Sequence, residues 1–443
     1  MIMRGFFCAL LSVLLWIESI WGGAIPKETQ YGEKTQDLQL YAQAAVLLDA
    51  DSGRVLYGKN EETPMAMAST TKIMTCILVL ENAETEEETG VSAYAASMPE
   101  VKLYVKQGEH YNVGELLFSL MLESHNDAAV VLAEYVGGKL LGESTDASEH
   151  TIAESKAALH RFAAAMNEKA VEIGCEDTWF ITPNGLDATE TLTLPDGSTQ
   201  EKEHHTTAKD LASILRYCIL ESSRREQFLE ITRTQDYSFT ENGRSFQCHN
   251  HNAFLQMMEG AFTGKTGFTN KAGYCYVGAL ERDGKRLIVA LLACGWPNHK
   301  TRKWSDSRTL FTYGLEHYAY RSFAEETFPE QETMLAPIPV AGGQNELLEP
   351  EVSLNVRMAG EPEGIDGLLM QEGEKVEILY RKEKKLRAPV MQGDTVGEIC
   401  YLVDGEIWRR ERLLAEETVR AIDLSWCVRQ ILERFLMKAS MEK

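Results

Sequence analysis

The sequence has no excess of basic residues, and this excludes a protein that binds nucleic acid through a basic surface. Its 44 lysines and arginines are outnumbered by 67 aspartates and glutamates, which gives a formal net charge of -23. Nucleic-acid recognition depends on a basic patch that neutralises phosphates. We therefore expect no nucleic-acid partner, and an isolated basic site in so acidic a chain would mark a place for a carboxylate ligand.

Motifs for metal binding are also missing. The nine cysteines form no Cys-x-x-Cys pair, and the ten histidines show no His-x-x-x-His spacing. These spacings are typical of zinc sites, so we predict neither a metal nor a cofactor. A chain this long does not need disulfide staples, and we expect the eight cysteines after Cys8 to be free thiols, mostly buried.

The N-terminus lacks an apolar run long enough to span a membrane. Arg4 is followed by an apolar stretch at residues 6–17, Glu18 interrupts it, and Gly-Gly-Ala occupies residues 22–24. This arrangement predicts a signal peptide over residues 1–24 that is removed after export. Cys8 lies too early for a lipid-attachment box, so we expect an extracytoplasmic protein without a lipid anchor there.

The remaining chain predicts an α+β protein of two domains followed by a helix. Its 443 residues exceed one hydrophobic core, and 44% apolar with 25% charged residues is ordinary globular composition. Strands and hairpin turns surround a helical middle, which predicts helices on an antiparallel sheet over residues 38–322. The segments behind this prediction are strands at 44–48, 54–57, 273–280 and 287–294, a helix at 70–80, helical periodicity through 113–220, and a helix at 304–320.

Beyond residue 325 the pattern changes to short segments that alternate at period two. Such segments at 352–356, 376–380 and 396–402 predict a small all-β sandwich over residues 330–412.

From Ala415 the pattern returns to helix. Leu424, Val428 and Ile431 share one face, and basic residues accompany them, including Arg429. We predict an amphipathic helix over 415–443 that lies on a membrane surface, the alternative being that it packs on the β module.

The chemistry is carried first by Ser-x-x-Lys at residues 69–72. Ser69 alone has a simple alternative explanation, since serine often caps the N-terminus of a helix. A cap does not explain Lys72, because a lysine in an otherwise apolar helix is costly without a partner or a role. At this spacing the two side chains share one face, and a lysine with a lowered pKa can take the serine proton.

Two further motifs follow in order, Ser124-x-Asn126 and Lys-Thr-Gly at 265–267. The three motifs together are the signature of penicillin-binding proteins and class A β-lactamases. With its blocks at 67–75, 126–138, 182–187 and 265–274, the sequence resembles the low-molecular-mass penicillin-binding proteins, the D-alanyl-D-alanine carboxypeptidases. The resemblance covers essentially all of residues 40–440.

The resemblance implies the penicillin-binding/β-lactamase-like transpeptidase fold and a serine carboxypeptidase that trims the D-Ala-D-Ala end of peptidoglycan stem peptides. β-Lactam antibiotics would be acylating inhibitors, and the C-terminal helix would sit on the outer face of the cytoplasmic membrane. The resemblance implies that Ser69 is the nucleophile, Lys72 its base and Ser124 a proton relay. It also implies that Asn126 holds the substrate amide, and that Lys265 and Thr266 bind the substrate carboxylate. Gly267 would admit the substrate backbone, and the Phe268 N–H would form the oxyanion hole together with the N–H of Ser69.

His125 departs from the family pattern, which commonly has glycine or alanine there. We expect it to point outward, the alternative being that it tunes Ser124.

The same motifs bear on other possible functions. A β-lactamase is disfavoured because residues 38–322 contain no Glu-x-x-Leu-Asn pattern, and a non-catalytic wall-binding protein is disfavoured because Ser69 and Lys72 are intact. A D,D-endopeptidase acting on crosslinks stays open, because the bond it cuts is chemically similar.

Overall fold

The computed structural model describes residues 38–193, 196–326 and 331–441, so the predicted signal peptide lies outside the described residues. The chain divides into two compact units. The first comprises Asp37–Tyr320 with Leu368–Glu372, and the second contains Arg321–Gly367 and Gly373–Lys443. Because their relative placement is not determined, each unit is described by itself.

A five-stranded antiparallel sheet forms the centre of the first unit. Its strands, in spatial order, are β2 (Val55–Lys59), β1 (Ala44–Asp49), β11 (Lys285–Leu292), β10 (Gly273–Arg282) and β9 (Ala261–Thr269). The two predicted hairpins are present, since β1 pairs with β2 and β10 pairs with β11. Strand β9 is an edge, so one side of it is open to another strand.

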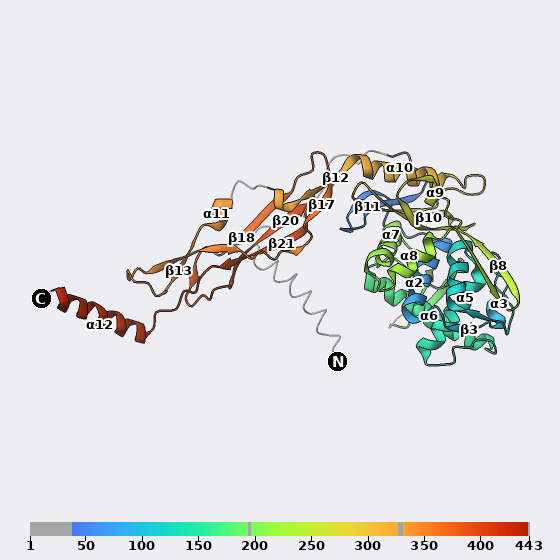
Figure 1. Cartoon of the computed structure of the whole chain (residues 1–443), viewed down its shortest axis with the longest axis horizontal. Coiled ribbons are helices and arrows are strands. Elements are labelled where there is room, and N and C mark those ends of the chain that lie inside the picture. The colour runs from blue at the N-terminus through green and yellow to red at the C-terminus, as the bar shows by residue number, and fades with distance from the viewer. Residues whose placement is uncertain (1–37, 194–195, 327–330, 442–443) are drawn as a thin grey trace. The chain divides into compact units, whose positions relative to one another are not determined.

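Helices bury both faces of this sheet. Along β1, Val46 packs in one apolar cluster and Leu47 in the other, as expected for side chains that alternate in direction. Helix α10 (Arg302–His317) covers one face, and α7 (Ala208–Arg216) packs with other helices on the opposite face (Figure 1). The predicted α+β arrangement is confirmed.

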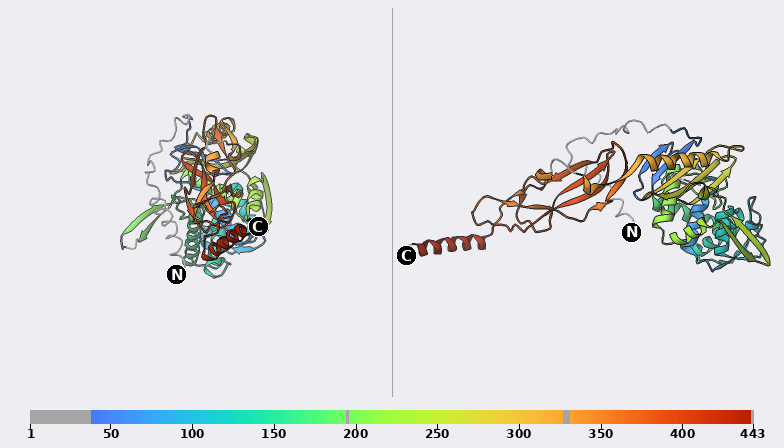
Figure 2. Two further views of the ribbon diagram at one scale, coloured as in Figure 1. Left: turned by 90° about the vertical axis from the view of Figure 1, so that its left-hand side faces the viewer. Right: turned by 45° about the horizontal axis from the view of Figure 1, so that its top comes forward.

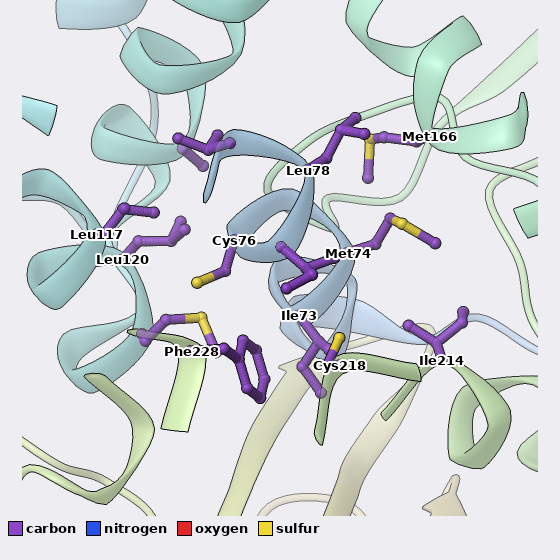
Figure 3. Packing of buried hydrophobic residues seen from close by; sticks show 14 of the residues in the cluster. Ile73, Met74, Cys76, Leu78, Leu117, Leu120, Met166, Ile214, Cys218 and Phe228 are labelled. Carbon is purple, nitrogen blue, oxygen red and sulfur yellow. The ribbon is translucent and has the colours of Figure 1, made fainter. Parts of the chain in front are cut away.

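Helix α2 (Lys72–Asn82) is buried on all sides. Its side chains point in several directions into the surrounding helices, as Figure 3 shows for Ile73, Met74, Cys76 and Leu78. The surrounding elements are α4 (Val113–Phe118), α5 (Asn126–Leu141), α6 (Ile152–Ile173), α7 and α8 (Arg225–Arg233). A helix enclosed in this way is a rigid support for groups at its N-terminus.

Shorter elements complete the first unit. They are β3 (Glu88–Gly90), α3 (Ala93–Ala96), β4 (His110–Asn112), β5 (Thr189–Thr193), β6 (Thr199–Glu203), β7 (Asp236–Glu241), β8 (Arg244–His249), α9 (Phe254–Met257), and β12 (Tyr318–Ser322) paired with β17 (Gly367–Gln371).

The second unit, coloured orange to red in Figure 2, contains two sheets, and the larger one is built around the hairpin β20–β21. One sheet has the order β14 (Glu351–Leu354), β13 (Ile338–Ala341), β19 (Leu386–Arg387). The other has the order β15 (Val356–Met358), β21 (Glu406–Ala415), β20 (Thr395–Val403), β18 (Glu377–Lys382), with β16 (Glu363–Gly364) beside β21. A short helix, α11 (Gln331–Leu335), precedes them. The segment predicted as one strand at 352–356 divides between the sheets.

The C-terminal helix begins later than Ala415, where the sequence predicted it. Ala415 still pairs with Val356, and Val419 bridges Val390. Helix α12 (Leu424–Met441) starts after Asp423, whose carboxylate accepts a hydrogen bond from the Trp426 N–H at 2.7 Å. Among the helices in the described part of the chain, none has the length and apolar character needed to cross a membrane.

All eight cysteines within the described residues are free thiols, as predicted. Six are buried and two, Cys400 and Cys427, are partly exposed.

Candidate active site

Ser69 lies in a 3-10 turn (Ala68–Thr71) that leads directly into α2, and Lys72 is the first residue of that helix. The Lys72 Nζ is 2.9 Å from the Ser69 Oγ. No side chain caps the start of α2, so the capping explanation for Ser69 is not supported. The turn instead presents a partly exposed hydroxyl beside a buried amine.

Lys72 is fully buried and contacts three oxygens. Besides Ser69, its Nζ donates to the Asn126 Oδ1 at 2.9 Å and to the Asn184 backbone oxygen at 2.6 Å. Burial lowers the pKa of Lys72 well below its usual range, and the charge of Lys265 lowers it further, against the raising effect of Asp127. A buried lysine with a lowered pKa has access to the neutral form that acts as a base.

A second serine–lysine pair joins the loop before α5 to strand β9. The Lys265 Nζ donates to the Ser124 Oγ at 3.0 Å and to the Thr266 backbone oxygen at 3.1 Å. Burial lowers the pKa of Lys265 to about 7, and the nearby Glu123 acts in the opposite direction. Ser124 adopts φ +68°, a left-handed conformation that non-glycine residues seldom take and that is concentrated at functional sites.

Asn126 is the first residue of α5 and is held from two sides. Its Nδ2 donates to the backbone oxygens of Pro99 at 3.3 Å and Glu100 at 3.1 Å. These bonds turn its Oδ1 toward Lys72. Asn126 therefore links Lys72 to the motif that contains Ser124.

Strand β9 presents Thr266, Gly267 and Phe268 at the sheet edge. A Cβ built on Gly267 would lie 2.9 Å from the Ser69 backbone nitrogen and 3.0 Å from the Met67 oxygen. The missing side chain therefore lets β9 approach the segment that carries Ser69, a requirement that the sequence did not reveal. Phe268 is exposed, with its ring 4.6 Å from that of Tyr274.

His125 does not point outward as the sequence analysis expected. It is half-buried, and its Nδ1 lies 2.7 Å from the Ser119 Oγ. Burial lowers its pKa, against the raising effects of Asp127 and Glu123. The histidine is thus held against the helical turn that precedes Ser124.

Two contributors to the site were missed by reasoning from sequence. Asn184 acts through its backbone oxygen, a group that every residue carries, so no side-chain pattern could single it out. The fully buried Asp127 accepts the N–H groups of Leu103 at 2.8 Å and Val105 at 3.2 Å, and so fixes the loop that Asn126 also contacts.

A serine whose hydroxyl contacts a buried lysine, with a second serine–lysine pair beside an open strand edge, defines a serine acyl-transfer enzyme of the penicillin-binding type. A family model described as D-alanyl-D-alanine carboxypeptidase matches residues 31–142 and 143–294. The chain belongs to this family and is a serine-type D-Ala-D-Ala carboxypeptidase of peptidoglycan metabolism.

Individual relatives agree with this assignment. The chain is 27% identical over 401 residues to D-alanyl-D-alanine carboxypeptidase DacF of Bacillus subtilis, covering 88% of this chain and 89% of that one. The crystal structure of the D-alanyl-D-alanine carboxypeptidase DacD from Francisella tularensis shares the fold, with a TM-score of 0.60, 22% identity, and coverage of 91% of this chain and 100% of that one. Penicillin-binding protein D2 from Listeria monocytogenes, solved in a cefotaxime-bound form, matches with a TM-score of 0.50 and 28% identity, covering 63% of this chain and 100% of that one.

Proposed function

We propose that this enzyme releases the terminal D-alanine of peptidoglycan pentapeptide stems through an acyl-enzyme on Ser69. The observation that carries the proposal is the contact between the Ser69 Oγ and the fully buried Lys72 Nζ. A neutral amine has two N–H groups and one lone pair. Because Asn126 and Asn184 each offer an oxygen to an N–H, the lone pair is left to face the Ser69 hydroxyl.

In the acylation step, Lys72 takes the hydroxyl proton as the Ser69 Oγ attacks the carbonyl carbon of the penultimate D-alanine. The backbone N–H groups of Ser69 and Phe268 stabilise the oxyanion that forms. As the peptide C–N bond breaks, the proton held by Lys72 passes through Ser124 to the leaving amine, which returns Lys72 to its neutral form. Water then attacks the ester, Lys72 again accepts a proton and returns it to Ser69, and the shortened peptide leaves.

Substrate recognition uses Lys265 and strand β9. Lys265 and the Thr266 hydroxyl bind the terminal carboxylate, where a cation in an otherwise acidic chain is selective for an anion. The substrate backbone lies along β9 as an added strand, because β9 is an edge of its sheet.

β-Lactams acylate the same serine and are released slowly. The Listeria relative, solved in a cefotaxime-bound form, supports the binding of this inhibitor class. The single Glu-x-x-Leu-Asn match of the chain, at 351–355, lies on and just after β14 in the second unit and not in the first unit that holds Ser69. The first unit therefore lacks the glutamate motif that β-lactamases use for fast deacylation.

The test compares Ser69→Ala with Ser198→Ala, which changes an exposed serine in the turn between β5 and β6. We expect Ser69→Ala to lose both fluorescent-penicillin labelling and D-alanine release, and Ser198→Ala to keep both. Mass spectrometry of the penicillin adduct should place it on the tryptic peptide containing Ser69. Persistent peptide trimming in Ser69→Ala contradicts the nucleophile assignment.

We further propose that the enzyme is exported by residues 1–24 and held at the outer face of the cytoplasmic membrane by α12. Leu424 is 81% exposed and Ile431 is 68% exposed, while Arg429 lies on the same helix. Exposed apolar side chains combined with basic ones suit an anionic bilayer surface. Ending the chain after Asp423 keeps the strand contacts intact and should move the protein from the membrane fraction to the soluble fraction, and retention on the membrane argues against the proposal.

A further inference from the structure

His204 lies just beyond the catalytic groups and connects two segments that meet at Lys72. It follows strand β6 and is only 3% exposed. Its Nε2 is 2.8 Å from the Thr71 Oγ1, and its Nδ1 accepts the Ile181 N–H at 3.0 Å. Thr71 immediately precedes Lys72, and Ile181 begins the turn that carries Asn184.

The hydrogen bonds of His204 fix its tautomer. A backbone N–H only donates, so the Nδ1 facing Ile181 must carry a lone pair and the proton must sit on Nε2. The Nε2–H then donates to the Thr71 Oγ1, whose own hydrogen goes to the Ala68 backbone oxygen at 2.9 Å. Burial lowers the pKa of His204 to about 3, with a further lowering from His205, so the ring stays neutral near pH 7.

The turn at 182–186 packs closely against the nucleophile segment. A Cβ on Gly185, which has φ +82°, would lie 2.0 Å from the Ala68 backbone oxygen. Thr75 donates its hydroxyl to the Pro183 oxygen at 2.6 Å. These contacts hold the middle of the turn, and His204 holds its beginning, so the position of the Asn184 oxygen depends on all three.

We propose that His204 is a positioning residue for the acyl-transfer reaction, holding the Asn184 carbonyl against Lys72 by joining the turn to Thr71. This inference rests on the proposed function, in which Lys72 is the base. If the carbonyl moves away, one N–H of the neutral amine loses its acceptor and the amine can rotate. Its lone pair then no longer faces Ser69 continuously, which slows acylation without weakening substrate binding.

The experiment measures acylation by a fluorescent penicillin in rapid-mixing kinetics, counting only sites that label at the end point. We expect His204→Ala to lower the limiting acylation rate constant by about tenfold or more, with the dissociation constant of the non-covalent complex within about twofold of the parent. His204→Gln, which keeps one acceptor and one donor, should recover part of the rate. His205→Ala is the matched control, an adjacent imidazole without a contact to Thr71, and should leave the rate unchanged.

Thr71→Val tests the same bond from its other end and carries the test if His204→Ala does not fold. It should also lower the limiting rate constant. The double variant with His204→Gln should be no slower than the slower single variant, because Thr71→Val already removes the bond that the glutamine only partly restores. Fully additive effects, or a loss of thermal stability with an unchanged acylation rate constant, would overturn the inference. Labelling that persists in Ser69→Ala would instead refute the proposed function, so the two failures are distinguishable.

Discussion

Gly267→Ala is the substitution whose effect is most directly fixed by the geometry. The added methyl group would lie 2.9 Å from the Ser69 nitrogen, and 3.0 Å from both the Met67 oxygen and the Thr70 nitrogen. All three neighbours are backbone atoms, which cannot rotate away as a flexible side chain does. Strand β9 and the nucleophile turn must therefore move apart by a few tenths of an ångström.

This movement has a cost in stability and a cost in rate. Overpacking by one methyl group typically costs about 1–3 kcal/mol. For a unit of this size, each kcal/mol lowers the melting temperature by roughly 2–4 °C. The Ser69 N–H is half of the proposed oxyanion hole, and loss of one such donor lowers a rate by roughly 100-fold or more. A partial displacement of Ser69 from Phe268 should then lower acylation by about 10-fold to 100-fold.

The assay is stopped-flow acylation by a fluorescent penicillin together with thermal unfolding. Gly142→Ala is the matched control, because Gly142 has φ +72° and open space around its α-carbon at the end of α5. It should lose about 1 kcal/mol through an unfavourable backbone conformation and keep its acylation rate. If Gly267→Ala acylates as fast as the parent, the close approach of β9 to Ser69 has no catalytic importance and the reasoning is refuted.

Three further outcomes are expected. Lys265→Met removes a positive charge near Lys72, so the pKa of Lys72 should rise. The acidic limb of the acylation pH profile should then move to higher pH. A limb that stays in place argues against an effect of Lys265 on the pKa of Lys72. The same variant should melt at a higher temperature than the parent, and the gain should be larger at pH 6 than at pH 9. The folded pKa of Lys265, about 7, lies below its unfolded value, so its buried charge destabilises the fold most at low pH and progressively less as pH rises through 7. Steady-state penicillin hydrolysis should be far slower than D-alanine release from a peptide, as measured on one enzyme preparation; equal rates would favour a β-lactamase.

Much of the fold followed from local patterns in the sequence. The hairpins β1–β2 and β10–β11 have turn residues between apolar runs, and their pairing depends on neighbouring residues only. Helix α2 was predicted from its continuous apolar composition. The later start of α12 was not predictable in this way, because Val419 forms a β-bridge with Val390, and this contact joins distant parts of the chain.

The site divides in the same manner. Ser69, Lys72, Ser124 and Lys265 were found because their side chains form motifs, and the structure brings them together as two hydrogen-bonded pairs. Asn184 was not singled out, since it acts through its backbone. A backbone group contributes to a site only through the tertiary packing that orients it, and the spacing of residues in a sequence does not reveal that packing.

The two lysines have the same ordinary pKa, yet their surroundings in the structure differ. Both are buried, and burial lowers both pKa values. Lys72 contacts only neutral oxygens, and the charge of Lys265 lowers its pKa more than Asp127 raises it. Lys265 has Glu123 nearby, which favours its charged form. Environments that push two pKa values apart assign the acid and base roles in an active site. Lys72 is therefore the one suited to lose its proton and serve Ser69, and Lys265 the one suited to stay charged for a carboxylate. The proposed role of Lys72 also depends on Lys265, because a charge on Lys265 favours the neutral form of Lys72.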